Sequence, residues 1–235
     1  MIRTALAVLF CIAAMPPGAL IAFPWTFITR NANFLYNLGM AIARCSVWLA
    51  GVKVEICGLE KLDSRSTYIF MSNHVSNLDP PVIIPRIPGR TSVLVKKELF
   101  RIPILGPAMR LGSLVPVDRS NREAAIASVQ AGVEVLKTGI HMTVFPEGTR
   151  SPDGKLHAFK KGPFYLASDS GLSVVPITIT GTEKLMPKGA SIIRPGKAVV
   201  TFHAPIDPQR FDTKEALMDA VRESIASALP RELRD

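Results

Sequence analysis

Cysteine is scarce in this sequence of 235 residues, and the three that occur lie far apart. Cys11, Cys45 and Cys57 are odd in number and show no paired spacing. Such a set predicts neither a disulfide framework nor a cysteine-based metal site. It is typical of a protein that faces a reducing compartment such as the cytosol.

Acidic residues are outnumbered by basic ones. The sequence has 19 Asp and Glu against 28 Lys and Arg, so the formal net charge is +9. This excess favours an anionic partner, which could be nucleic acid, a lipid surface or a phosphorylated substrate. The basic residues are scattered, and no zinc-finger spacing or RNA-binding aromatic motif occurs. We therefore expect membrane lipid, and no nucleic acid, as the partner.

Charge is missing from most of the N-terminal segment. Residues 4–29 contain no Asp, Glu, Lys, Arg or His, and residues 31–43 are again uncharged. A helix over the first run would be long enough to cross a bilayer core of roughly 30 Å. Pro16, Pro17 and Pro24 predict that this helix is interrupted. The segment is then a kinked span, a re-entrant loop or a pair of short interfacial helices, and a cleaved signal peptide is the alternative.

The rest of the chain alternates between strand-like and helix-like patterns, which predicts an α/β fold. We expect a central, mostly parallel or mixed sheet flanked by helices, with no internal repeat. Pro116 and Pro176 suggest that their strands lie at an edge or a bulge. Two helices have start signals, one at Ser120 and one with Asp212 as its cap. Strands are predicted over 52–57, 67–71, 91–95, 113–117, 140–145, 172–180 and 198–202, and helices over 120–137 and 213–229.

This pattern predicts two parts. Residues 1–50 form membrane-associating helices, and residues 51–235 form one catalytic domain.

The stretch SNHVSNLDPP, over residues 72–81, follows an apolar strand. His74 and Asp79 are five positions apart, so a regular helix would point them in different directions. A turn would let them meet. One interpretation is structural: Asp79 caps a short helix over 80–86 and His74 is a surface residue. The other is a catalytic pair in which the carboxylate orients an imidazole that removes a proton.

A second polar stretch, FPEGTRSPDG over residues 145–154, also follows an apolar strand. Its second half is a good type I turn, and an arginine in a loop is usually only a solvated charge. Gly148 permits close approach of the backbone, Thr149 offers a hydroxyl, and Arg150 offers a fork suited to phosphate oxygens.

Two further strand ends carry basic residues. Arg119 follows the strand over 113–117, and Lys96 ends the strand over 91–95. Ligands gather at the carboxyl ends of parallel strands. We therefore expect the four polar strand ends to converge.

Taken in order, these motifs resemble those of the lysophosphatidic acid acyltransferases within the glycerolipid acyltransferase family. Asn73, His74 and Asp79 match the family's NH-four-residues-D motif, and the complete FPEGTRS matches another. Val117-Asp118-Arg119 matches the second motif, although Pro116 departs from its usual lead-in, and VVPI over 174–177 matches the fourth. The resemblance covers roughly residues 51–205.

The resemblance implies acyl transfer from acyl-CoA or acyl carrier protein to the sn-2 hydroxyl of lysophosphatidic acid, giving phosphatidic acid. His74 would be the base and Asp79 would orient it. Lys96, Arg119 and Arg150 would hold the acceptor phosphate. Pro176 would shape the acyl or CoA side.

Three neighbouring residues are also assigned to the acceptor site. Glu147 and Thr149 would help to arrange it, and Gly148 would offer an N–H to the oxyanion. No GxSxG motif occurs, so the attack on the thioester is expected to be direct.

The thioester is already activated, so we expect no metal and no cofactor beyond the acyl donor. The expected location is a bacterial inner membrane, with the catalytic domain on its cytoplasmic face. Two other functions stay open: the same transfer to another lysophospholipid or to an acylated amino-acid lipid, and a non-catalytic protein that binds anionic lipid.

Overall fold

The computed structural model describes residues 1–117 and 122–234. Within them, seven strands form one mixed sheet in the order β1-β7-β6-β2-β5-β3-β4. The run from β6 to β4 is parallel throughout, whereas β7 pairs with β6 in antiparallel fashion and β1 is parallel to β7. The strands are β1 (Val52–Cys57), β2 (Ile69–Ser72), β3 (Thr91–Lys96), β4 (Val115–Val117), β5 (His141–Val144), β6 (Val174–Thr180) and β7 (Gly196–Phe202).

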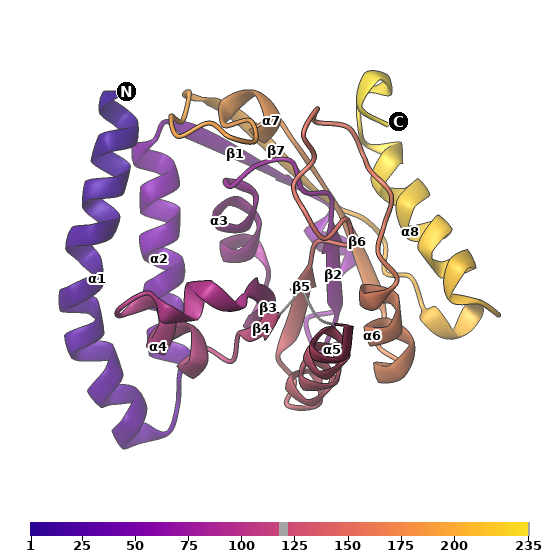
Figure 1. Cartoon of the computed structure of the whole chain (residues 1–235), viewed down its shortest axis with the longest axis horizontal. Helices are drawn as coiled ribbons and strands as arrows, with labels where there is room; N and C mark the ends of the chain where they lie inside the picture. Colours follow the sequence, from indigo (N-terminus) through magenta and orange to yellow (C-terminus); the bar gives the residue numbers. More distant parts are fainter. Residues whose placement is uncertain (118–121, 235) are drawn as a thin grey trace.

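Helices cover both faces of this sheet, so the predicted α/β architecture is confirmed (Figure 1). The N-terminal pair lies on one flank of the molecule and α8 lies on the other. The helices are α1 (Ile2–Thr29), α2 (Asn33–Leu49), α3 (Asp79–Ile83), α4 (Leu105–Leu111), α5 (Arg122–Lys137), α6 (Gly162–Ser170), α7 (Thr182–Leu185) and α8 (Lys214–Ser227).

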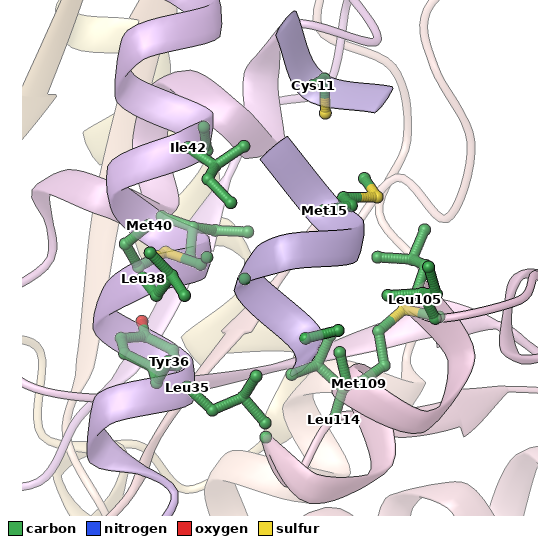
Figure 2. Close-up of a pocket in the computed structure, with 18 of the residues that line it drawn as sticks. Cys11, Met15, Leu35, Tyr36, Leu38, Met40, Ile42, Leu105, Met109 and Leu114 are labelled. Carbon is green, nitrogen blue, oxygen red and sulfur yellow. The ribbon is translucent and has the colours of Figure 1, made fainter. Parts of the chain in front are cut away.

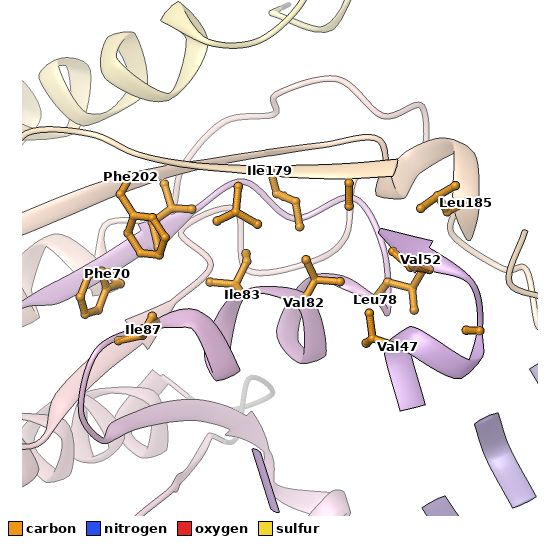
Figure 3. Close-up of a cluster of buried hydrophobic side chains, with 14 of the residues drawn as sticks. Val47, Val52, Phe70, Leu78, Val82, Ile83, Ile87, Ile179, Leu185 and Phe202 are labelled. Atoms are coloured by element: carbon orange, nitrogen blue, oxygen red, sulfur yellow. The ribbon is translucent and has the colours of Figure 1, made fainter. Parts of the chain in front are cut away.

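Alternation along the strands divides the core into two apolar layers. In β2, Phe70 faces one layer while Ile69 and Met71 face the other, because successive strand side chains point to opposite faces. The first layer packs on α2 and α3 and contains Val82 and Phe202 (Figure 3). The second layer packs on α5, α6 and α8. All four residues of β2 are buried, as its continuous apolar run predicts.

The N-terminal helix differs from the prediction. Pro16, Pro17 and Pro24 all lie inside α1, which nevertheless continues over 28 residues. Each proline removes one hydrogen bond, but α1 packs along α2 for much of its length (Figure 1). Tertiary packing contributes more to helix stability than local preference does, so the helix persists. The division at residue 50 stays a prediction.

Two of the three predicted helix caps are wrong, and the third is not tested. Asp79 lies in the first turn of α3 and does not cap it, and the helix ends at Ile83 before a separate 3₁₀ turn, Ile84–Arg86. Thr213, not Asp212, caps α8, because its hydroxyl accepts a hydrogen bond from the N–H of Ala216. The expected cap at Ser120 lies outside the described residues.

Pro116 lies in the edge strand β4, as expected, but Pro176 lies in the interior strand β6. The carbonyl of Pro176 accepts a hydrogen bond from the N–H of His203 at 2.9 Å, so this residue faces β7. The pairing with β7 begins one residue later, at Ile177. An isolated antiparallel bridge joins Val174 to Ile206, so two residues of β6 oppose three residues after β7. Pro176 lies at this bulge, as the bulge alternative predicted, and its missing N–H costs little there.

Candidate active site

The parallel strands β6, β2, β5 and β3 all end at one edge of the sheet, which we call the carboxyl edge. His74 follows β2, Glu147 follows β5, and Lys96 ends β3. The topology therefore brings three of the predicted strand ends to the same side of the molecule, as expected for a site in an α/β sheet.

The His74–Asp79 pair forms as the catalytic interpretation predicts. Nδ1 of His74 lies 2.8 Å from Oδ2 of Asp79. The chain between them folds into a turn, in which the same Oδ2 accepts hydrogen bonds from the N–H groups of Val75 at 2.7 Å and Ser76 at 2.8 Å. The carboxylate thus holds the turn and the imidazole together.

Asp79 is fully buried and is surrounded by donors. Its second oxygen, Oδ1, accepts a hydrogen bond from the Thr182 hydroxyl at 2.7 Å. A buried carboxylate is costly unless its oxygens are hydrogen-bonded, and here both are. This arrangement favours an ionised Asp79 that fixes the tautomer of His74, with the proton on Nδ1.

The imidazole of His74 is held between this carboxylate and an aromatic ring. The ring of Phe145 stacks on it, with centroids 4.1 Å apart and planes 25° apart. The side chain of His74 is 16% exposed. Among the described residues, Nε2 has no hydrogen-bond partner and is not buried. A neutral imidazole in this tautomer presents the Nε2 lone pair to solvent, where it can accept a proton.

The FPEGTRS loop holds the backbone of His74 from both sides. Oε1 of Glu147 accepts a hydrogen bond from the N–H of His74 at 2.7 Å, and the N–H of Ser151 donates to the carbonyl of His74 at 2.7 Å. The strand ends of β2 and β5 are therefore joined at His74 itself. This connection explains why the motif that contains His74 and Asp79 lies next to the FPEGTRS motif in the fold.

Glu147 is buried, and its other oxygen, Oε2, accepts a hydrogen bond from the N–H of His157 at 3.2 Å. Burial raises the pKa of Glu147 to about 7, although hydrogen bonds from the backbone of His74 and His157 act in the opposite direction. With both oxygens bound to backbone, Glu147 acts on the site by positioning His74. Direct contact with an acceptor stays a prediction.

Two of the three predicted phosphate ligands lie in the described part of the chain. Thr149 is exposed and Arg150 is half-buried, and the carbonyl of Arg150 accepts a hydrogen bond from Nζ of Lys188. Lys96 is exposed, and its Nζ lies 3.7 Å from a carboxylate oxygen of Glu98. Arg119 lies outside the described residues. The phosphate roles of Lys96, Arg119 and Arg150 stay predictions.

Gly148 adopts a left-handed backbone with φ of 73°, which favours glycine. Its N–H donates to the carbonyl of Phe145 at 3.0 Å. This hydrogen bond closes the turn, and the donation of the N–H to an oxyanion stays a prediction.

Two residues of the site have roles that no sequence pattern assigned. Thr182 is 103 positions from Asp79, so no local signal connects them. Asn73 lies in the first motif and is buried, and its side chain bonds both backbone groups of Ile179 in β6. These contacts at 2.8 and 2.9 Å fix the exit of β2 against its neighbour.

Residues 53–180 match the protein family described as Acyltransferase. The chain belongs to this family. A 1-acyl-sn-glycerol-3-phosphate acyltransferase from Limnanthes alba is 38% identical over 78% of this chain and 64% of the plant protein. A protein of the same name from Borreliella burgdorferi is 33% identical over 80% of this chain and 76% of its own length.

A solved structure supports the family assignment at the level of the fold. The crystal structure of the 1-acyl-sn-glycerophosphate (LPA) acyltransferase from Thermotoga maritima has a TM-score of 0.81 and 29% sequence identity. The match covers 95% of this acyltransferase and 93% of that chain. The chain spans less than two thirds of the length of the Limnanthes relative, so its own substrates are argued from the site below.

Proposed function

We propose that this acyltransferase moves an acyl group from acyl-CoA or acyl carrier protein to the sn-2 hydroxyl of 1-acyl-sn-glycerol-3-phosphate, giving phosphatidic acid. The observation that carries the proposal is the His74–Asp79 pair at 2.8 Å, whose free imidazole nitrogen opens to solvent. The names of the plant and bacterial relatives support this choice of acceptor.

The reaction follows from the geometry of the pair. Nε2 of His74 takes the proton of the acceptor hydroxyl while its oxygen attacks the thioester carbonyl. The C–S bond then breaks, and the imidazolium returns the proton to the departing thiolate. The negative charge of Asp79 stabilises the imidazolium between these two steps. The thioester is already activated, so the proposal needs no metal ion or cofactor.

The acceptor phosphate would be held by Arg150, Lys96 and Arg119. Among the described residues, the guanidinium of Arg150 has no hydrogen bond or ion pair, so its fork is available to an anion. Arg150 also lies on the loop that holds His74, which would couple binding of the phosphate to the position of the base.

The N-terminal helices would keep the site at a membrane. In the described chain, α1 is long and apolar enough to cross a bilayer, and many of its apolar side chains are exposed. Trp25 and Trp48 are also exposed, and tryptophan suits the membrane–water boundary. We infer that the acyltransferase works at a bacterial inner membrane from the cytoplasmic side, where the lipid acceptor and the soluble acyl donor meet.

The test is release of free thiol from oleoyl-CoA by the purified full chain, with lysophosphatidic acid, lysophosphatidylcholine or lysophosphatidylglycerol as acceptor. We expect lysophosphatidic acid to give the highest kcat/KM. A higher value with another lysophospholipid would reject the proposed acceptor. Thiol release that needs no acceptor would reject acyl transfer in favour of hydrolysis.

The matched variants are His74→Ala and His203→Ala. We expect His74→Ala to lower kcat by about 10² to 10⁴, the range for a lost general base. His203 follows β7, whose end pairs with the start of β6, so it lies at the opposite edge of the sheet. We expect the His203 variant to keep near-normal turnover. Equal turnover by the two variants would contradict the role of His74.

A further inference from the structure

A cavity lies away from the proposed catalytic pair. It has a volume of about 600 Å³ and lies between α2 and the edge of the sheet at which β3 and β5 begin. Asn37 and Arg44 of α2 line one side, and Arg90 and residues 138–140 line the other. His74 follows the end of β2, a strand parallel to β5, so the cavity and the catalytic pair are at opposite edges.

The cavity carries positive charge that no nearby carboxylate neutralises. Arg44 and Arg90 line it, and none of its lining residues is Asp or Glu. Arg86 adds a third charge beside it, and burial together with the charge of Arg44 lowers the pKa of Arg86. In the described part of the chain, none of these three arginines takes part in an ion pair. Like charges held this close favour the binding of an anion.

Arg44 and Arg90 are only weakly hydrogen-bonded, whereas Nη1 of Arg86 donates to the carbonyl of Pro81 at 3.1 Å. Nε of Arg90 is buried and has no acceptor. Its Nη1 lies 3.3 Å from Oδ1 of Asn33, and its Nη2 lies 3.5 Å from the carbonyl of Gly112. Arg44 reaches the carbonyl of Pro85 at 3.5 Å. These bonds are long and their acceptors are neutral, whereas guanidinium groups bind phosphate through short, charge-assisted pairs.

An apolar space adjoins this cavity. A second cavity of about 330 Å³ lies among α1, α2 and α4, and Figure 2 shows Met15, Leu38 and Met109 along it. Tyr36, Met40 and Ile84 line both cavities. The charged cavity is therefore next to an apolar space formed by the helices whose outer side chains suit a membrane.

We propose that Arg44 and Arg90, assisted by Arg86, bind the phosphate group of an anionic phospholipid at a site separate from the catalytic pair. The charge and the weakly bonded guanidinium groups of Arg44 and Arg90 select a phosphate. The adjoining apolar space and the exposed apolar side chains of α1 favour a lipid as its source over free phosphate. Such a site fixes α2 against the sheet when the protein is at the membrane. The site does not depend on the proposed acyl transfer.

The test uses the full chain in detergent and native mass spectrometry, which counts bound lipids. The probes are dioleoyl phosphatidylglycerol and dioleoyl phosphatidylcholine. We expect the double variant Arg44→Gln, Arg90→Gln to weaken phosphatidylglycerol binding by about tenfold or more, the effect of losing charge-assisted bonds. Binding of phosphatidylcholine should change by less than about twofold.

A matched control removes the same charge elsewhere. Arg65 and Arg210 are exposed, with side chains that are 91% and 82% accessible. The double variant Arg65→Gln, Arg210→Gln should leave the binding of both lipids unchanged. An equal loss in the two double variants would reject a specific site and leave only general attraction to a basic surface.

A third variant keeps the arginines and so does not depend on the fold surviving their loss. Asn37→Asp places a carboxylate in the cavity, where it would pair with the arginines and exclude the lipid phosphate. Asn31→Asp places the same charge at the turn before α2, outside the cavity lining. We expect only Asn37→Asp to abolish selectivity for phosphatidylglycerol. Selectivity that survives Asn37→Asp would overturn the proposal.

A competition experiment separates the two sources of phosphate. Inorganic phosphate at millimolar concentration should leave phosphatidylglycerol bound. Displacement of the lipid by inorganic phosphate, dependent on Arg44 and Arg90, would reject a lipid and assign the cavity to a free anion. All of these measurements are made without an acyl donor, so they stand or fall separately from the acyltransferase assay.

Discussion

Replacing Asp79 with Asn is the sharpest test of the proposed chemistry, because the structure predicts that the fold survives and the reaction does not. Asn can keep the same hydrogen bonds. Its Oδ1 can take the place of Oδ2 toward His74, Val75 and Ser76, and its Nδ2 can donate to the Thr182 hydroxyl, which is also an acceptor. The change removes charge and little else.

The expected loss of rate follows from that charge. A unit charge about 4 Å from the imidazolium contributes about 4 kcal/mol at an effective dielectric constant of about 20. This energy corresponds to about 10³-fold in kcat, since each ~1.4 kcal/mol is tenfold. Replacing charge-assisted hydrogen bonds with neutral ones should lower the free energy of unfolding by only about 1 to 3 kcal/mol.

Thr182→Val is the matched control. It removes the hydroxyl that donates to Oδ1 of Asp79 but leaves the carboxylate charge facing His74. An unpaired buried acceptor costs about 1 to 3 kcal/mol of stability, so this variant should resemble Asp79→Asn in its unfolding. Its kcat should fall by less than about tenfold.

The assay is initial-rate thiol release at saturating acyl-CoA, together with denaturant unfolding followed by far-ultraviolet circular dichroism. The reasoning is refuted if folded Asp79→Asn keeps a kcat within a few-fold of the parent. It is also refuted if the Thr182 and Asp79 variants lose the same activity, because the effect would then come from structure and not from charge.

Three further predictions concern the surroundings of the pair. The pKa of Glu147 is raised to about 7, so the folded state holds the proton of its carboxyl group more tightly than the unfolded state does. Loss of that proton therefore destabilises the fold as pH rises from about 4.5 to about 7. The parent should lose about 3 kcal/mol relative to Glu147→Gln over that window in unfolding experiments, and parallel pH curves would contradict this. Asn73→Ala should cost about 2 to 4 kcal/mol, because the buried N–H and C=O of Ile179 lose their partners, and a loss below about 1 kcal/mol would show that water replaces the side chain. Arg150→Ala should raise the KM for lysophosphatidic acid by about tenfold to 100-fold and leave that for acyl-CoA unchanged, whereas equal changes in both would argue against a phosphate role.

Local patterns in the sequence predicted most of the fold. The seven strands lie within a few residues of the predicted segments, because apolar runs and alternation are properties of each segment by itself. The turn that joins His74 to Asp79 was also predictable, since proline and asparagine act on the chain within a few residues. The family's motifs then placed FPEGTRS in the same site.

Local rules failed where distant contacts outweigh them. Prolines predicted a broken α1, but packing on α2 keeps it continuous. Pro176, by contrast, follows its local rule, because it lies at a bulge of the interior strand β6. For α1, a local cost of a few kcal/mol per proline is smaller than the tertiary packing that opposes it.

The sequence by itself determined which residues can do chemistry and at which strand ends they lie. Only the tertiary structure decided what holds them there. The Thr182 hydroxyl reaches Asp79 across 103 positions, Glu147 reaches the backbone of His74 across 73, and Arg44 and Arg90 meet around one cavity. Hydrogen bonds and charges act over a few ångströms of space whatever the separation along the chain, and sheet order, which no single segment encodes, sets those distances.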